Sequence, residues 1–122
     1  MAGFKKFEDI IAWQKARIIA QLVYKITSGR PFVTDYALRD QIRRSCVSVM
    51  SNIAEGYGRR SDKEFATFLN SAHGSIAETQ SHLYIARDIG YLDDATFSQI
   101  YDQLDEVSRM VMKVAQHLRT DL

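Results

Sequence analysis

The segment AEGYGRR, residues 54–60, places two closely spaced glycines before two arginines, a combination that could hold a phosphate group. Phosphate-binding loops of the Walker and dinucleotide types follow a β-strand, and the Walker type also needs a Lys-Ser or Lys-Thr ending. Here the residues before the glycines have the apolar spacing of a helix, and neither motif is complete. We therefore interpret Gly56 or Gly58 as a helix C-cap. Both glycines are also candidates for close helix packing or a subunit contact.

Basic side chains lie on both sides of these glycines and could bind an anion. The candidates are Arg43, Arg44, Arg59, Arg60 and Lys63. In a purely structural interpretation, the two arginines after the glycines cap helix carbonyls and pair with Glu55, Asp62 or Glu64. In a functional interpretation they bind a phosphate, helped by the free amides at the start of the next helix. The sequence leaves both interpretations open.

The three histidines do not complete a metal or catalytic motif. Di-iron bundles use Glu-x-x-His pairs, and no carboxylate precedes His73, His82 or His117 by three residues. Glu78 and His82 are four residues apart, a spacing that favours a surface hydrogen bond over a metal site. One cysteine and dispersed histidines do not make a four-ligand zinc site, and no Gly-x-Ser-x-Gly motif marks a nucleophile. We expect no metal, no cofactor and no catalytic residue.

Composition limits the class of protein further. A chain of 122 residues with 46% hydrophobic and 25% charged residues is typical of one soluble globular domain. The net charge of +1 gives no compositional support for nucleic-acid binding, although a local basic patch is compatible with it. Cys46 has no partner for a disulfide, which favours a cytoplasmic setting. We interpret it as a small, buried hydrophobic residue. The start MAGFKKFEDI has no apolar run, so we expect neither a secretory signal nor a membrane span.

Apolar spacing near 3.6 residues predicts helices at about 7–28, 35–57, 62–89 and 94–119. Thr34 or Asp35 is the expected N-cap of the second helix, and the sequence SDKE from Ser61 predicts a capping box for the third. Gly29 is expected to supply a left-handed cap after the first helix. Four long helices with short connections predict an all-α, antiparallel up-down-up-down four-helix bundle that forms a single domain over residues 1–122.

The first helix carries more apolar surface than one bundle needs. Its main apolar face is predicted to contain Ile11, Ile18, Leu22 and Ile26, and this face is widened by Trp13, Ala16, Ala20 and Val23. Further aromatic residues lie off the main faces of the helices, namely Trp13, Tyr24, Tyr84 and Tyr101. This excess predicts a second, intermolecular surface and hence self-association. Asn52 and Glu55 are interpreted as contacts of the second helix with a neighbouring helix or subunit.

The blocks FEDIIAWQKA, SNIAEGYGR and EFATFLNSAHGSIAE give the chain a resemblance to the 23S rRNA-intervening sequence proteins. That family includes the accessory variability determinant of diversity-generating retroelements. The resemblance implies a four-helix bundle that forms barrel-like homopentamers with a basic surface. In the retroelement relative it also implies binding to nucleic acid and to a reverse transcriptase. The residues that match the family blocks are Arg43, Arg44, Asn52, Glu55, Gly56, Gly58 and Arg59.

The sequence therefore favours a non-enzymatic, cytoplasmic, self-associating bundle that binds RNA or DNA through backbone phosphates. A rival hypothesis is a structural adaptor that binds a protein partner through exposed aromatic residues, centred on Trp13 or Tyr101. The two differ in salt dependence, because only phosphate contacts release counterions.

Overall fold

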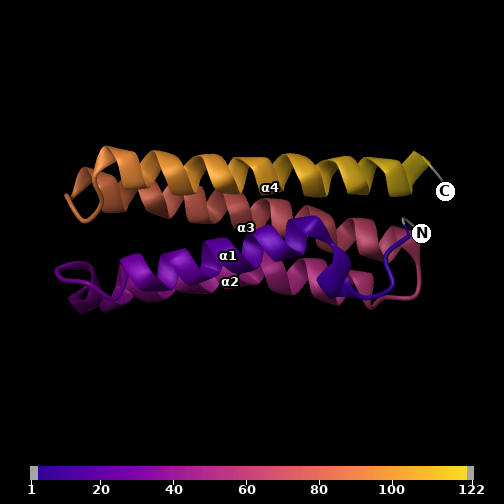
Figure 1. The fold of residues 1–122 in the computed structure, drawn as a ribbon, viewed down its shortest axis with the longest axis horizontal. Helices are drawn as coiled ribbons and strands as arrows, with labels where there is room; N and C mark the ends of the chain where they lie inside the picture. The colour runs from indigo at the N-terminus through magenta and orange to yellow at the C-terminus, as the bar shows by residue number, and fades with distance from the viewer. Residues whose placement is uncertain (1–2, 121–122) are drawn as a thin grey trace.

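The structure is a computed structural model that describes residues 3–120, and it consists of four long helices lying side by side (Figure 1). Each helix runs opposite to the preceding one, and residues 3–120 contain no strand. The helices are α1 (Ile11–Ile26), α2 (Tyr36–Tyr57), α3 (Asp62–Asp88) and α4 (Asp94–Thr120). Two short 3-10 turns, η1 (Phe7–Asp9) and η2 (Phe32–Thr34), precede α1 and α2. The predicted all-α four-helix bundle is confirmed.

Side-chain oxygens cap the N-termini of α2 and α3. Asp35 Oδ1 accepts a hydrogen bond from the Leu38 amide at 3.2 Å, and Ser61 Oγ accepts one from the Glu64 amide at 3.1 Å. Each bond satisfies an amide that has no acceptor within its own helix. The Ser61 hydroxyl also donates to the Glu64 carboxylate at 3.3 Å. Both caps agree with the sequence prediction.

The ends of α1 differ from the prediction. Residues 7–9 form the separate turn η1, so the α-helix begins at Ile11. At the other end, the Thr27 hydroxyl donates to the Val23 carbonyl and the Ser28 hydroxyl donates to the Tyr24 carbonyl, both at 2.7 Å. These bonds satisfy the last carbonyls without a left-handed residue, and Gly29 does not have a positive φ. The predicted left-handed cap at Gly29 is therefore wrong.

The face that α1 turns to the core also differs from the prediction. Trp13 and Ala16 are buried, whereas the side chains of Ile11 and Ile18 are 49% and 57% exposed. The Trp13 ring packs edge-on against Phe7, with the ring centroids 5.0 Å apart. Two neighbouring faces of α1 are apolar, and the face with small residues is the one that can approach the other helices closely. Trp13 is thus a core residue and not an exposed aromatic.

Helices α2 and α3 are joined by polar contacts as well as apolar packing. The Thr79 hydroxyl donates to Ser45 Oγ at 2.9 Å, and both residues are buried. One turn later in α2 and one turn earlier in α3, the Ser48 and Ser75 hydroxyls are 2.9 Å apart. These two pairs fix the antiparallel register of α2 against α3, and so fix the positions of the basic residues that α2 carries.

Candidate nucleic-acid interface

The predicted basic residues form two clusters and not one. Arg43 and Arg44 lie in the first half of α2, whereas Arg59, Arg60 and Lys63 lie at the turn between α2 and α3. At about 1.5 Å per residue, the two clusters are roughly 20 Å apart along the helix. A single small anion therefore does not contact both clusters of one chain.

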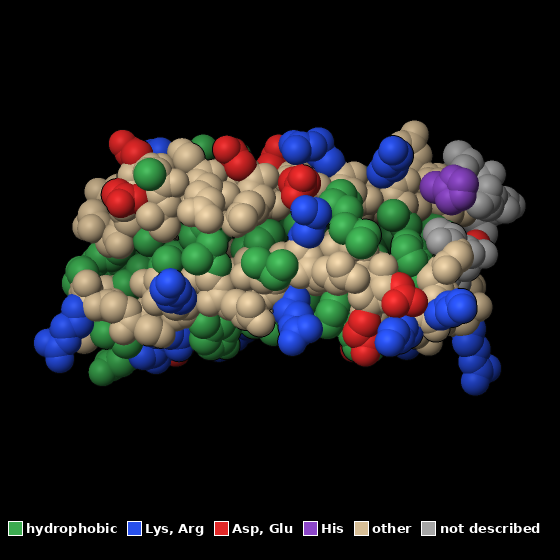
Figure 2. Space-filling model, viewed as in Figure 1, with side chains coloured by type: hydrophobic (Ala, Val, Ile, Leu, Met, Phe, Trp, Pro, Cys, Tyr) green, Lys and Arg blue, Asp and Glu red, His purple; other side chains and the backbone are tan. Residues whose placement is uncertain are grey.

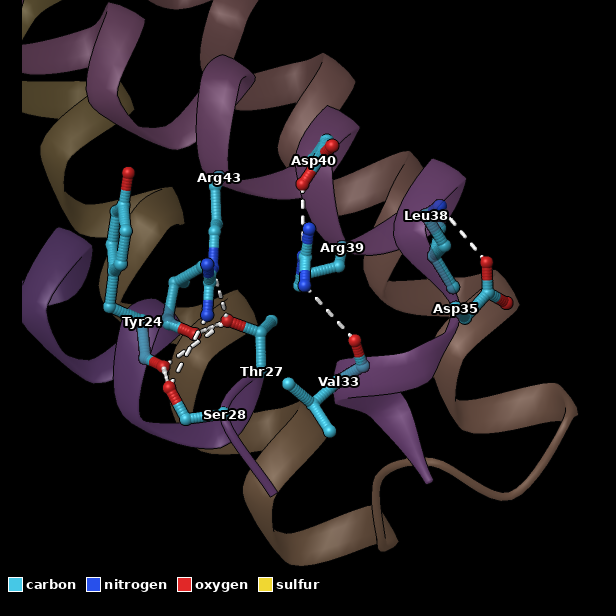
Figure 3. A network of polar contacts seen from close by, with 10 residues as sticks. Tyr24, Thr27, Ser28, Val33, Asp35, Leu38, Arg39, Asp40 and Arg43 are labelled. Atoms are coloured by element: carbon cyan, nitrogen blue, oxygen red, sulfur yellow. Dashed lines mark hydrogen bonds and ion pairs between the residues drawn. The ribbon is translucent and has the colours of Figure 1, made fainter. Parts of the chain in front are cut away.

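Arg43 joins α2 to the end of α1 (Figure 3). Its Nε donates to Thr27 Oγ1 at 2.8 Å, and its Nη2 donates to Ser28 Oγ at 3.3 Å. The guanidinium carbon lies 4.5 Å from the centroid of the Tyr24 ring. The side chain is thus held by two hydroxyl groups and an aromatic face, and its charge lies at a helix C-terminus, where a cation is favoured.

Arg39 makes a second link of the same kind, one turn before Arg43 (Figure 3). Its Nη1 donates to the Val33 carbonyl at 3.1 Å, and its Nε is paired with Asp40 Oδ1 at 2.9 Å. Its guanidinium carbon lies 4.8 Å from the centroid of the Tyr36 ring. Arg39 therefore neutralises Asp40 on this face of α2.

Arg44 is exposed and makes no hydrogen bond or ion pair with any residue between 3 and 120. It lines two grooves. One has a volume of about 380 Å³ and is lined by Tyr24, Asp40, Arg43, Arg44 and Val47. The other has a volume of about 220 Å³ and is lined by Gln41, Arg44, Ser45, Ser48 and Glu78. Arg44 is thus the basic residue of the first cluster whose whole guanidinium group is without a hydrogen-bond or ion-pair partner among residues 3–120.

At the turn between α2 and α3, Arg59, Arg60 and Lys63 are all exposed. The Arg59 guanidinium carbon lies 4.7 Å from the centroid of the Phe68 ring. Within residues 3–120, none of the three basic residues forms an ion pair with Glu55, Asp62 or Glu64. The ion pairs of the structural interpretation are therefore not formed, and these charges remain uncompensated by direct contacts.

Charge is divided unevenly between the two halves of the chain. Residues 1–61, with α1 and α2, contain eleven Lys and Arg against five Asp and Glu, a net charge of +6. Residues 62–122, with α3 and α4, contain five Lys and Arg against ten Asp and Glu, a net charge of −5. We call these the basic half and the acidic half. In Figure 2 most blue side chains lie in the lower part, over α1 and α2, and most red ones lie over α4.

The total charge of +1 hides this division, because the charges of the two halves nearly cancel. Counting charges for each predicted helical hairpin would have revealed it, since the helix boundaries near residue 61 were predicted correctly.

The described part of the chain contains no group of three or more His, Cys, Asp or Glu residues that could hold a metal ion. His82 Nε2 lies 3.6 Å from Glu78 Oε2, and this nitrogen is buried without a hydrogen-bond partner among the described residues, so the predicted surface hydrogen bond between the two is not formed. Burial raises the pKa of the Cys46 thiol to about 12, so this group is not a reactive thiolate near neutral pH. Between residues 3 and 120, no helix has both the length and the apolar character required to cross a bilayer.

A family model described as 23S rRNA-intervening sequence protein matches residues 8–113. The chain belongs to this family. The matched region contains both clusters of basic residues and all of α1, α2 and α3.

One solved structure with the same fold is a protein of unknown function from the S23 ribosomal protein family of Bacteroides thetaiotaomicron. The TM-score is 0.78 at 21% sequence identity, and the match covers 85% of this chain and 97% of that chain. At this identity the likeness shows the shared fold. A comparison with curated proteins finds no match.

Most of the family block SNIAEGYGR, residues 51–59, forms the last turns of α2, which ends at Tyr57, and Gly58 and Arg59 follow the helix. Asn52 Nδ2 donates within its own helix, to the Ser48 carbonyl at 2.8 Å and the Ser48 hydroxyl at 3.0 Å. Glu55 is exposed. Gly56 is buried inside the helix, and Gly58 is the C-cap with a φ of −74°. The two glycines therefore have different roles, close packing for Gly56 and helix termination for Gly58.

The aromatic residues of the adaptor hypothesis are only partly at the surface. Trp13 is buried, and Tyr101 is half-buried against Tyr84, with their ring centroids 5.8 Å apart. Tyr24 and Tyr84 are exposed. An adaptor surface centred on Trp13 is thus ruled out by its position in the core.

Proposed function

We propose that this member of the 23S rRNA-intervening sequence protein family is a non-enzymatic, self-associating bundle that binds nucleic acid through backbone phosphates. The division of charge carries this proposal. The basic half has a net charge of +6, and Arg44 and Arg60 extend from it without ion-pair partners among residues 3–120. Lys63, at the adjoining start of α3, is likewise exposed and forms no ion pair with these residues. Such cations bind the phosphates of a nucleic acid whatever its base sequence, and their binding releases counterions from the nucleic acid.

The same division of charge supports self-association. The basic half of one copy complements the acidic half of the next, and a contact of this head-to-tail type closes into a ring when the rotation allows it. Exposed apolar side chains lie on both halves, with Ile11 and Ile18 on α1, Ile85 on α3 and Ile89 at the C-cap of α3. A homopentamer is the oligomer that the family resemblance implies. Light scattering after size exclusion tests this part of the proposal, and a stable monomer would contradict it.

Binding is tested with fluorescein-labelled poly(U), whose anisotropy is measured at salt concentrations between about 50 and 200 mM. We expect affinity to fall steeply with salt. The double change Arg59→Ala and Arg60→Ala should reduce the slope of log affinity against log salt by about 1.4, since each lost phosphate contact on a single strand contributes about 0.7.

Arg109→Ala is the matched control for that variant. Arg109 is also exposed, but it lies on α4 in the acidic half and is already paired with Asp105. We expect this change to leave the salt slope unaltered. The proposal is wrong if poly(U) and duplex poly(A)·poly(U) both fail to bind at the lowest salt, or if the Arg109 variant loses as much affinity as the double variant.

A protein-binding adaptor is the second candidate, and one observation favours it. Tyr84, Ile85 and Ile89 expose apolar surface together near the end of α3. The adaptor hypothesis requires that the affinity for a protein partner does not depend on salt. It also requires that the double change Ile85→Ser and Ile89→Ser lowers that affinity. The nucleic-acid proposal requires that these two changes leave poly(U) affinity unaltered, so the same variant separates the two candidates.

A further inference from the structure

We propose that the groove lined by Tyr24, Asp40, Arg43, Arg44 and Val47, here called the Tyr24 groove, binds one nucleotide of a single-stranded nucleic acid. The base stacks on the Tyr24 ring, and the adjoining phosphate is held by Arg43 and Arg44. This inference rests on the proposed function, and it adds the type of strand and the residues that distinguish it.

The groove combines two kinds of surface that a single strand requires. Tyr24 is 46% exposed and, with Val47, gives the groove an aromatic and apolar part. Arg43 and Arg44 give it two positive charges. Contacts with phosphates alone would leave Tyr24 and Val47 without a ligand group to cover them. Single-strand sites instead combine cations that follow the backbone with aromatic rings on which bases stack.

Arg43 is already held in a position to serve both parts. Thr27 and Ser28 fix two of its nitrogens, and the guanidinium lies 4.5 Å from the Tyr24 ring centroid (Figure 3). Its third nitrogen, Nη1, makes no hydrogen bond with any residue between 3 and 120, so this nitrogen can donate to a phosphate. A side chain that is fixed before binding loses little conformational freedom on binding.

The charges around Arg44 favour the Tyr24 groove over the neighbouring groove. In the Tyr24 groove, the carboxylate of Asp40 is paired with Arg39 at 2.9 Å. The neighbouring groove is lined by Glu78 as well as by Arg44, and a carboxylate there repels a phosphate. A strand bound by Arg44 therefore lies on the Tyr24 side of that residue.

The size and chemistry of the groove select a single strand over a duplex. A volume of about 380 Å³ is at the lower end of the range for small-ligand sites, which start near 300 Å³. In a duplex the faces of the bases are covered by their neighbours, so no base can stack on Tyr24. Duplex binding would depend on the arginines alone.

The experiment compares binding of poly(U) and of the duplex poly(A)·poly(U) to four variants. Tyr24→Leu should weaken poly(U) binding about ten-fold and change duplex binding less than about two-fold, because stacking contributes only to the single strand. Arg44→Gln should weaken binding of both probes, because both present phosphates. The controls are Tyr84→Leu and Arg109→Gln, in the acidic half. Tyr84 has a similar exposure, 43%, and also lies against an arginine, Arg87. We nevertheless expect Tyr84→Leu and Arg109→Gln to leave the affinity for both probes unchanged.

Crosslinking gives a second measurement on the unaltered protein. Poly(U) that contains 4-thiouridine should form an adduct at Tyr24 on irradiation, identified by mass spectrometry. The inference is overturned if Tyr24→Leu leaves poly(U) affinity unchanged, if it weakens single-strand and duplex binding equally, or if adducts form at Tyr84 and not at Tyr24. Loss of poly(U) binding in Arg44→Gln but not in Tyr24→Leu would leave the proposed function standing and reject only the stacking. Absence of binding to both probes by the unaltered protein would reject the proposed function itself.

Discussion

Gly56 on α2 lies directly against Phe68 on α3: a Cβ atom at position 56 would be 2.5 Å from the Cβ of Phe68. Gly56→Ala should therefore force the two helices apart and lower the free energy of unfolding by about 1–3 kcal/mol. Urea denaturation measures this loss. Gly74→Ala is the control, because a Cβ at that position would meet no atom within 4 Å apart from its chain neighbours and the backbone of its own helix. There we expect a gain of roughly 0.5–1 kcal/mol from helix propensity. Equal effects of the two changes would show that Gly56 is not a packing position.

Arg43 and Arg44 are adjacent in sequence but differ in what they contact. Arg43→Ala removes two hydrogen bonds and the contact with the Tyr24 ring, and we expect it to lower the free energy of unfolding by about 1–2 kcal/mol. Arg44→Ala removes an exposed side chain and should change it by less than about 0.5 kcal/mol. Thermal denaturation of the two variants tests this difference. A larger loss for Arg44→Ala would mean that Arg44 has a structural role.

The buried pair Ser45 and Thr79 lends itself to a double-mutant cycle. Thr79→Val removes the hydrogen bond to Ser45 and leaves a buried hydroxyl without its donor, at a cost of about 1–3 kcal/mol. Adding Ser45→Ala removes that hydroxyl, so the double variant should lose less stability than the sum of the two single variants. Strict additivity in urea denaturation would show that the two hydroxyls are not coupled.

Cys46 should make the stability depend on pH in the alkaline range. Burial raises the pKa of its thiol from 9.0 to about 12, so between these values the unfolded chain loses a proton that the folded chain keeps. The unfolded state then binds fewer protons, and rising pH lowers the free energy of unfolding, by on the order of 1 kcal/mol per pH unit from this group. Comparing the unaltered protein with Cys46→Ala at about pH 8 and about pH 10 isolates the effect, because the other titrating groups are common to both. Identical slopes would contradict it.

The sequence predicts the number, order and approximate limits of the helices because those depend on local signals. The carboxylate of Asp35 and the hydroxyl of Ser61 cap the helices that follow them. The rotation of α1 about its axis is different, since two neighbouring faces of this helix are apolar. Only the neighbouring helices decide that Trp13 and Ala16 face inward while Ile18 faces solvent.

The candidate site shows the same limit. Arg44, Arg60 and Lys63 are exposed basic residues, as a sequence pattern can indicate. The fixed position of Arg43 depends on Thr27 and Ser28, which are separated from it by a turn and by 16 and 15 residues. The Tyr24 groove likewise exists only where α1 and α2 meet. Contacts of this range are set by the tertiary fold and leave no local pattern.

The division of the bundle into a basic and an acidic half also gives a single copy a large electric dipole. Because the halves lie on opposite sides of the long axis, this dipole points across the helices and not along them. A polyanion that approaches from any direction therefore exerts a torque that rotates α1 and α2 toward it before contact. In a closed ring of head-to-tail copies, the dipoles follow one another around the circumference and cancel by symmetry. Ring closure would thus remove the orienting torque while keeping every charge in place, and dielectric relaxation would register assembly as a loss of dipole moment.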